Sequence, residues 1–401
     1  MIGLPFDHFV SYNNAMGIQD KTALVLTGGG ARAAYQVGVL RALGEILPGT
    51  ENPFPIISGT SAGAINAGFL AARLNDWDAA VNRLQELWLS LTLEDIYRTS
   101  GVSLSQIAWD WVKRILFGTF LKKQNQANFL LDTSPLRKLL ETEMDFEAIR
   151  ANFLGQSLTG LSFSALDYAT GETVSFFHDS CEREPWLRSG RMGVRTDLNA
   201  EHVMASSAIP IFFPPVRIHS SHYGDGSLRQ TAPLSPAIHM GAERIVAVSI
   251  RYEKKRINDN DDEALPPHAP SLAEISGQLM NSLFLDSLDA DLERLKRMNI
   301  EAEHYPEGGM KVIPVLVLKP SRSLEELLPN LLERFPVGLR FLLRGLGVSS
   351  NQGNALMSYL AFLPDCIQPL LELGYEDTLA RKDEIIGFMC GLKNTVPHSQ
   401  K

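Results

Sequence analysis

Two short apolar runs near the start of the chain are each followed by a glycine-containing turn and a helix-forming segment. The first run, Thr22 to Thr27, ends at three consecutive glycines, and residues 31–47 favour a helix. The second run, Phe54 to Ser58, ends at Gly59-Thr60-Ser61-Ala62-Gly63, and residues 64–73 again favour a helix. Repeated units of strand, turn and helix predict a mainly parallel sheet covered by helices. We therefore expect an α/β fold.

Strand-like runs recur much later in the chain, so one sheet is expected to extend over most of its length. These runs lie at residues 158–167, 172–177, 244–250 and 311–318, and a long helical pattern covers residues 272–298. A sheet that receives strands this late keeps its layers within one domain. We predict one domain over residues 20–320.

The remainder of the chain, residues 321–401, has a helical composition interrupted by Pro329, Pro336, Pro364 and Pro369. Proline lacks a backbone N–H and usually ends or kinks a helix. We therefore predict a C-terminal extension of several helices, packed on the domain of residues 20–320 and broken at these prolines.

Composition narrows the class of protein. Hydrophobic residues make up 45% of the chain and charged residues 21%, values typical of a folded globular protein. The 46 acidic residues outnumber the 37 basic ones, which disfavours nucleic acid as a partner. Three widely spaced cysteines in no CxxC pair suit a reducing compartment. With no export signal in residues 1–14 and no apolar run near ~18 residues, we expect a cytoplasmic protein, at most peripheral to a membrane.

The segment Gly59-Thr60-Ser61-Ala62-Gly63 is a G-x-S-x-G motif between an expected strand and an expected helix. A serine on such a sharp turn has a strained backbone, and glycines two residues away on either side remove side chains that would collide. Its hydroxyl would stand at a helix N-terminus, where the dipole favours developing negative charge. Ser61 is therefore a candidate nucleophile.

The glycine loop Gly28-Gly29-Gly30 could supply backbone amides for an oxyanion, because it opens on the same sheet edge as Ser61. The same residues with Ala33 also fit the dinucleotide fingerprint G-x-G-x-x-A. That fold requires an acidic residue at the end of the second strand, where this chain has Ser58. Nucleotide binding is thus the weaker interpretation.

A base is needed to take the proton of a serine hydroxyl. Asp225-Gly226 follows a strand-like run at residues 216–218 and a short polar loop. A buried aspartate can act as that base without histidine when desolvation raises its pKa. On the residues alone, Asp-Gly is more typical of an ordinary turn than of a catalytic base.

Four motifs together resemble those of the patatin-like phospholipases. They are GGGAR at residues 28–32, GTSAG at 59–63, the segment ASSAIPIFFPP at 205–215, and Asp225-Gly226, in that order. The resemblance implies a three-layer α/β/α fold related to the catalytic domain of cytosolic phospholipase A2. It also implies hydrolysis of lipid acyl esters by a Ser-Asp dyad, of the phospholipase A or lysophospholipase type.

Carried over to this sequence, the resemblance makes Ser61 the nucleophile, Asp225 the general base, and Gly28, Gly29 and Gly30 the oxyanion loop. Arg32, in the same loop, is a candidate for binding a substrate phosphate, or it ties the loop to a carboxylate of the protein. No cofactor is implied. A catalytically silent module that binds lipid or protein stays an alternative.

The histidines test two competing chemistries. A Ser-His-Asp esterase needs a late histidine in a loop motif, and none of His239, His268, His304 and His398 lies in one. His219 and His222 with Asp225 could form a metal site, but no third ligand group is evident. No metal is expected. Two apolar segments with basic residues, 104–116 and 337–346, are expected to be core helices, with a membrane-surface element as the weaker alternative.

Overall fold

A computed structural model describes residues 21–48, 52–99, 131–253 and 272–391, except 306, 308, 329, 346, 347 and 349–352. The predicted helix at 104–116, the N-terminal segment 1–14 and the break at Pro329 lie outside the described residues.

The strands form a ten-stranded sheet with the order β12-β11-β1-β2-β5-β6-β8-β7, and β10 and β9 extend it alongside β5. Five neighbouring strands run parallel to one another: β12 (Val315–Leu318), β11 (Arg244–Val248), β1 (Thr22–Leu26), β2 (Ile56–Thr60) and β5 (Gly160–Asp167). The others are β6 (Thr173–Asp179), β7 (Trp186–Arg188), β8 (Arg191–Arg195), β9 (Val216–Ile218) and β10 (Ser221–Asp225). A separate antiparallel pair joins β3 (Arg98–Thr99) and β4 (Leu131–Asp132).

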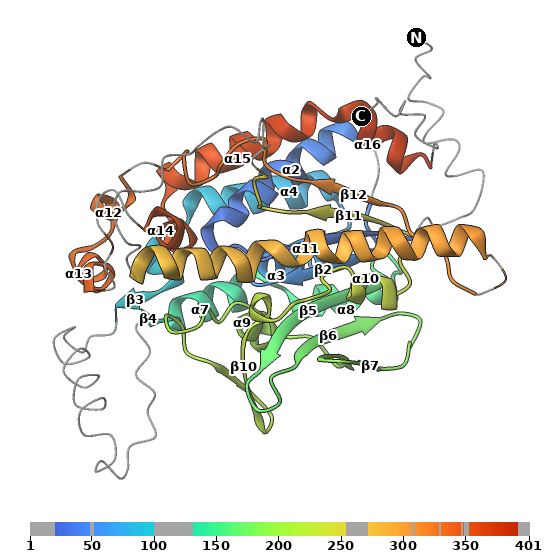
Figure 1. Cartoon of the computed structure of the whole chain (residues 1–401), viewed down its shortest axis with the longest axis horizontal. Helices are drawn as coiled ribbons and strands as arrows, with labels where there is room; N and C mark the ends of the chain where they lie inside the picture. Colours follow the sequence, from blue (N-terminus) through green and yellow to red (C-terminus); the bar gives the residue numbers. More distant parts are fainter. Residues whose placement is uncertain are drawn as a thin grey trace, which may run out of the picture.

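Helices cover both faces of this sheet (Figure 1). The first half of the chain forms η1 (Gly30–Ala33), α2 (Ala34–Ile46), α3 (Ala62–Ala71), α4 (Trp77–Ser90), α5 (Leu93–Ile96), α7 (Ser134–Glu143) and α8 (Phe146–Leu154). The middle forms α9 (Ala200–Ser206), η2 (Gly226–Leu228), α10 (Ser235–His239) and α11 (Leu272–His304). The C-terminal part forms α12 (Leu331–Arg334), α13 (Val337–Gly345), α14 (Asn354–Leu360), α15 (Pro364–Leu379) and α16 (Lys382–Met389).

Alternating residues of the central strands enter two different hydrophobic cores. In β1, Leu24 and Leu26 pack into the core shared with α2, α3 and α4, whereas Ala23 and Val25 pack into the core shared with α10 and α11. A strand with side chains on both faces buried is expected in a helix-covered parallel sheet. The three-layer α/β/α fold is therefore confirmed.

Several element boundaries differ from the predicted ones, most of them by a few residues. Strand β2 continues through Gly59 to Thr60, because its backbone pairs with β5 up to Ser164. Strand β12 begins only at Val315, where pairing with β11 starts. The predicted break at Pro369 is wrong, since this proline lies inside α15, where packing on α2 outweighs the lost hydrogen bond.

The C-terminal helices pack tightly on the sheet domain. A side chain at Gly38 of α2 would lie 1.9 Å from the carbonyl of Leu371, and one at Gly374 would lie 2.1 Å from the carbonyl of Tyr35. The two backbones therefore approach as closely as only glycines allow. Residues of both ranges share one hydrophobic core. The boundary at residues 320 and 321 stays a prediction.

Candidate active site

Strand β5 brings Ser61 and Asp225 together although 164 positions separate them in the chain. The parallel strand β2 ends with Thr60 opposite Ser164 of β5. The antiparallel strand β10 reaches the same place from the other direction and ends with Asp225 opposite Ala165. Strands β2 and β10 therefore end next to each other along β5. Ser61 directly follows the end of β2, and Asp225 is the last residue of β10.

Ser61 stands on the sharp turn predicted between β2 and α3. Its backbone has φ 56° and ψ −129°, a conformation that costs a non-glycine residue free energy. A side chain at Gly59 would lie 2.5 Å from the carbonyl of Gly63, and one at Gly63 would lie 2.3 Å from the carbonyl of Leu26. Both glycines are thus required by close backbone contacts.

Two serines hold the backbone of this turn. The amide of Ser61 donates to Ser206 Oγ at 2.9 Å, and this hydroxyl donates to the carbonyl of Ser164 at 2.6 Å. Ser207 Oγ donates to the carbonyl of Ser61 at 3.1 Å. Ser206 and Ser207 lie in the motif at residues 205–215. The sequence did not predict that these two serines hold the Ser61 turn. Their contacts oppose relaxation of the strained turn.

The hydroxyl of Ser61 donates to Asp225 Oδ2 at 2.5 Å. Asp225 is completely buried and Ser61 is 1% exposed. The other carboxylate oxygen of Asp225 accepts from the amide of Ser227 at 2.9 Å. Burial raises the pKa of Asp225 to about 6, although hydrogen bonds from Ser61 and Ser227 oppose the rise. At neutral pH the carboxylate is ionised and can accept a proton.

The glycine loop lies beside the Ser61 turn, because Gly63 contacts the carbonyls of Leu26 and Thr27 at the end of β1. Gly28, Gly29 and Gly30 are buried, and Gly30 has φ 54°. Among the residues that the structure describes, the amides of these three glycines donate to no acceptor. Buried N–H groups are rarely left unpaired. The loop can therefore offer donors to an anionic group.

A buried polar network joins this loop to the helix that follows Ser61. Trp88 Nε1 donates to Asn66 Oδ1 at 2.8 Å, and Asn66 Nδ2 donates to Gln36 Oε1 at 3.0 Å. Gln36 Nε2 then donates to the carbonyl of Thr27 at 2.7 Å, directly before Gly28. Asn66 and Gln36 are fully buried. Sequence reasoning missed this network, and buried polar residues in two apolar helices were the only available signal.

The side chain of Arg32 is buried and its partners come from α11 and the C-terminal part of the chain. Its guanidinium donates to Ser358 Oγ at 2.8 Å, Glu325 Oε1 at 2.8 Å and Asn281 Oδ1 at 3.2 Å. It also donates to the carbonyl of residue 355 and lies 4.1 Å from the centre of the Tyr359 ring. Of the two predicted roles for Arg32, this placement supports the tie to a carboxylate. A substrate phosphate would have to displace these partners.

Two of the histidines considered in the sequence, His268 and His398, lie outside the described residues. His219 and His222 are exposed on the β9–β10 hairpin, whereas the carboxylate of Asp225 faces Ser61. His202 accepts a hydrogen bond from the amide of Asn199, and burial lowers its pKa to about 4. Within the described ranges, no histidine contacts the Ser61–Asp225 pair and no three side chains cluster as metal ligands.

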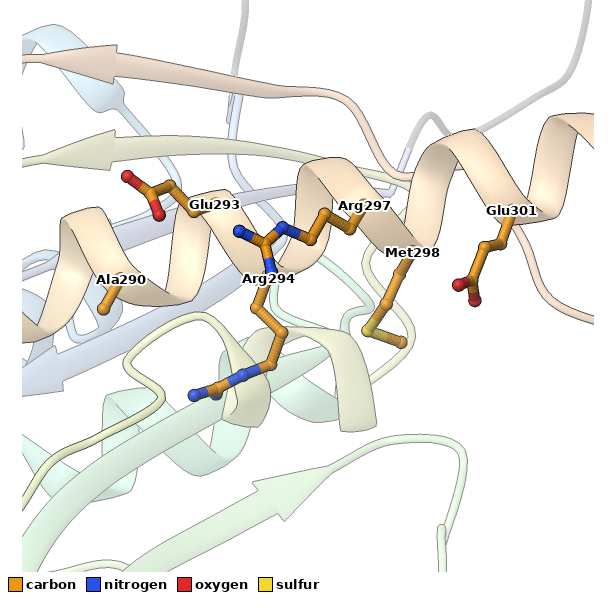
Figure 2. A pocket seen from close by; sticks show the side chains of 6 residues that line it. All are labelled: Ala290, Glu293, Arg294, Arg297, Met298 and Glu301. Atoms are coloured by element: carbon orange, nitrogen blue, oxygen red, sulfur yellow. The ribbon is translucent and has the colours of Figure 1, made fainter.

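A surface hollow lies elsewhere, along one helix. Figure 2 shows its lining, which comes from α11 alone: Ala290, Glu293, Arg294, Arg297, Met298 and Glu301. It contains neither Ser61 nor Asp225.

None of the helices in the described part of the chain is long and apolar enough to cross a bilayer.

This chain is similar to known proteins in structure and in sequence. The chain aligns with two solved structures, VipD from Legionella pneumophila and human GIVD cytosolic phospholipase A2 in complex with methyl gamma-linolenyl fluorophosphonate. The identities are 12% and 13%, and the TM-scores are 0.33 and 0.44. The alignments cover 92% and 96% of this chain, which spans 67% and 62% of the two structures. A search of curated proteins found no match.

A sequence model of one family also matches residues 24–238, more than half of the chain, under the description "Patatin-like phospholipase". The matched range contains the glycine loop, the Ser61 turn, residues 205–215 and Asp225, which are the motifs that carried the resemblance. The chain therefore belongs to the patatin-like phospholipase family.

Proposed function

We propose that this protein hydrolyses acyl esters of lipids with Ser61 and Asp225 as a catalytic dyad. The observation that carries the proposal is the 2.5 Å hydrogen bond from the Ser61 hydroxyl to a fully buried carboxylate. Membership of a lipid hydrolase family supports the class of substrate. The finer assignment is a carboxylic ester hydrolase of the phospholipase A or lysophospholipase type.

In the proposed first step, Ser61 Oγ attacks the ester carbonyl while Asp225 takes the hydroxyl proton. The pKa of Asp225, raised to about 6, lies closer to neutral than that of an exposed aspartate. It is therefore a better base at neutral pH. The negative charge that develops on the carbonyl oxygen would be bound by the amides of Gly28, Gly29 and Gly30.

Collapse of this intermediate releases the alcohol part of the lipid, which receives the proton from Asp225. The acyl group remains as an ester of Ser61. A water molecule then attacks this ester, Asp225 accepts its proton, and the fatty acid leaves as the serine hydroxyl is restored. The same two residues thus serve both halves of the reaction, and histidine is not needed in either.

The proposal is tested with the purified full chain and a panel of acyl esters. The panel contains a diacyl phospholipid, a lysophospholipid, a diacylglycerol and a soluble p-nitrophenyl ester, and released fatty acid or alcohol is measured. We expect turnover of at least one lipid and covalent labelling of Ser61 by a fluorophosphonate, located by peptide mass spectrometry.

Lipid association without turnover or labelling would contradict the proposal and favour a silent lipid-binding module. Labelling at another serine would show that the nucleophile is that serine and not Ser61. Protection against thermal unfolding by NAD or FAD, with no label, would favour the nucleotide interpretation.

A further inference from the structure

Helix α13 exposes large apolar side chains on its outer face. Val337 is 73% exposed and Phe341 is 61% exposed, although Leu339 and Leu343 of the same helix are completely buried. Residues four positions apart lie on the same side of a helix. The helix therefore packs one apolar face into the core and presents a second apolar face outward, which is costly in water.

The same helix is basic within an acidic protein. Its residues Val337–Gly345 include Arg340 and Arg344 and no acidic residue, whereas the whole chain has a formal net charge of −9. Within the described ranges, neither guanidinium pairs with a carboxylate. Apolar side chains flanked by arginines are typical of helices that lie in the headgroup region of anionic bilayers.

Helix α13 follows α12, which packs against α14. In Figure 1 these helices lie at the same end as β3 and β4. Helix α14 in turn contacts the glycine loop, since a side chain at Gly30 would lie 2.2 Å from the carbonyl of Tyr359. Phe341 and Val337 thus lie on a helix that is connected to this loop through α12 and α14.

A third exposed apolar residue, Ile211, lies on a turn near the site. Ile211 is 63% exposed and has φ 72°, a left-handed conformation that a β-branched side chain seldom adopts. The next residue, Phe212, accepts a hydrogen bond from the amide of Leu131 in β4, which places this turn at the same end. Four residues earlier, Ser207 holds the carbonyl of Ser61. The left-handed backbone holds this isoleucine side chain in solvent, where contact with an apolar partner would remove its surface from water.

We propose that Val337, Phe341 and Ile211, with Arg340 and Arg344, form a docking face for an anionic lipid bilayer. The apolar side chains enter the headgroup region and the two arginines bind lipid phosphates. This proposal rests on the proposed lipid hydrolase function, because the face would bring the site against the surface that holds its substrate.

The test measures binding separately from turnover. The full chain with Ser61→Ala is sedimented with vesicles of phosphatidylcholine, with or without phosphatidylglycerol. We expect binding to the anionic vesicles that high salt weakens. The double variant Arg340→Gln/Arg344→Gln should lower the partition coefficient roughly thirtyfold, from about fivefold per basic residue. Val337→Ser/Phe341→Ser and Ile211→Ser should each lower it on the order of tenfold.

Matched controls come from exposed leucines on other elements. Leu154 at the end of α8 is 87% exposed and Leu187 in β7 is 67% exposed, and Figure 1 places α8 and β7 away from α13. Leu154→Ser and Leu187→Ser should bind vesicles as strongly as their parent. Equal losses in these controls, or unchanged binding of the α13 variants, would overturn the proposal.

Two further measurements separate this inference from the proposed function. In the chain with Ser61 intact, the α13 variants should hydrolyse a soluble p-nitrophenyl ester at the wild-type rate and a vesicle phospholipid more slowly. Loss of both activities would place these residues in the fold or the active site instead. Sedimentation velocity without lipid tests whether a second copy of the chain covers this face. A dimer that dissociates in the Phe341→Ser variant would refute docking to a bilayer.

Discussion

Arg32 Nη2 lies 2.8 Å from Glu325 Oε1, so the loop that carries Gly28 to Gly30 is tied to the C-terminal part of the chain. The guanidinium of Arg32 is 2% exposed, and Glu325 is 31% exposed. A charge buried this deeply needs its partners, because few water molecules can replace them. The C-terminal extension is therefore structurally coupled to the loop in which we place the oxyanion donors.

Replacement of Glu325 tests this coupling. We expect Glu325→Ala to lower kcat for a soluble ester about tenfold with little change in KM, because the loop moves while ester access is unchanged. Glu325→Gln, which keeps a hydrogen-bond acceptor, should restore most of the rate. Asp365→Ala breaks the exposed pair with Arg334 in the same region and serves as control. Equal rates in Glu325→Ala and Asp365→Ala would argue against a positioning role.

Removal of either member of the dyad should nearly abolish turnover. We expect Ser61→Ala and Asp225→Asn each to reduce kcat by about 10³-fold or more, with no further loss in the double variant, because the two groups act as a unit. Ser58→Ala is the matched control, since this buried serine of β2 bonds to Ser162 and not to Asp225. Steady-state kinetics and circular dichroism are the measurements. Additive losses would contradict a shared step.

The raised pKa of Asp225 predicts the pH dependence of the rate. Because the ionised carboxylate is the proposed base, kcat/KM should fall about tenfold per pH unit below pH about 6 and stay level above it. The soluble ester allows this profile to be measured without changes in lipid ionisation. A profile that remains level well below pH 6 would exclude Asp225 as the base.

The same pKa predicts an opposite effect on stability. The folded state binds the proton of Asp225 more tightly than the unfolded state, so stability decreases as pH rises from about 4 to about 6. Each pKa unit corresponds to about 1.4 kcal/mol, so the ionised group costs on the order of 3 kcal/mol above that range. Asp225→Asn should therefore raise Tm at about pH 8 and leave it almost unchanged near pH 4. Equal shifts of Tm at both pH values would refute this linkage.

The network of Trp88, Asn66 and Gln36 should matter for both stability and reactivity. Asn66→Ala leaves two buried partners unpaired, so we expect a loss of about 1–3 kcal/mol in the free energy of unfolding and slower fluorophosphonate labelling. Asn152→Ala is the control, because Asn152 is also buried and donates to the carbonyl of Ala71 in α3. It should lose similar stability in urea but label at the wild-type rate.

The sequence alone determined the family, the α/β class and the order of the main elements. Local patterns were sufficient because apolar runs, glycine turns and helix-forming stretches act within a few residues of each other. The G-x-S-x-G turn at Ser61 was predictable for the same reason, since its glycines are required by backbone contacts inside the turn and with the adjacent β1. The family assignment agrees with that prediction.

The tertiary structure decided how these pieces meet. The approach of Ser61 and Asp225 depends on the register of β5, which stops β2 at Ser164 and β10 at Ala165. The partners of Arg32 come from positions 249 to 326 residues further along the chain, so no local pattern could choose between a phosphate and Glu325. Burial, which raises the pKa of Asp225, likewise arises only when distant segments pack around it.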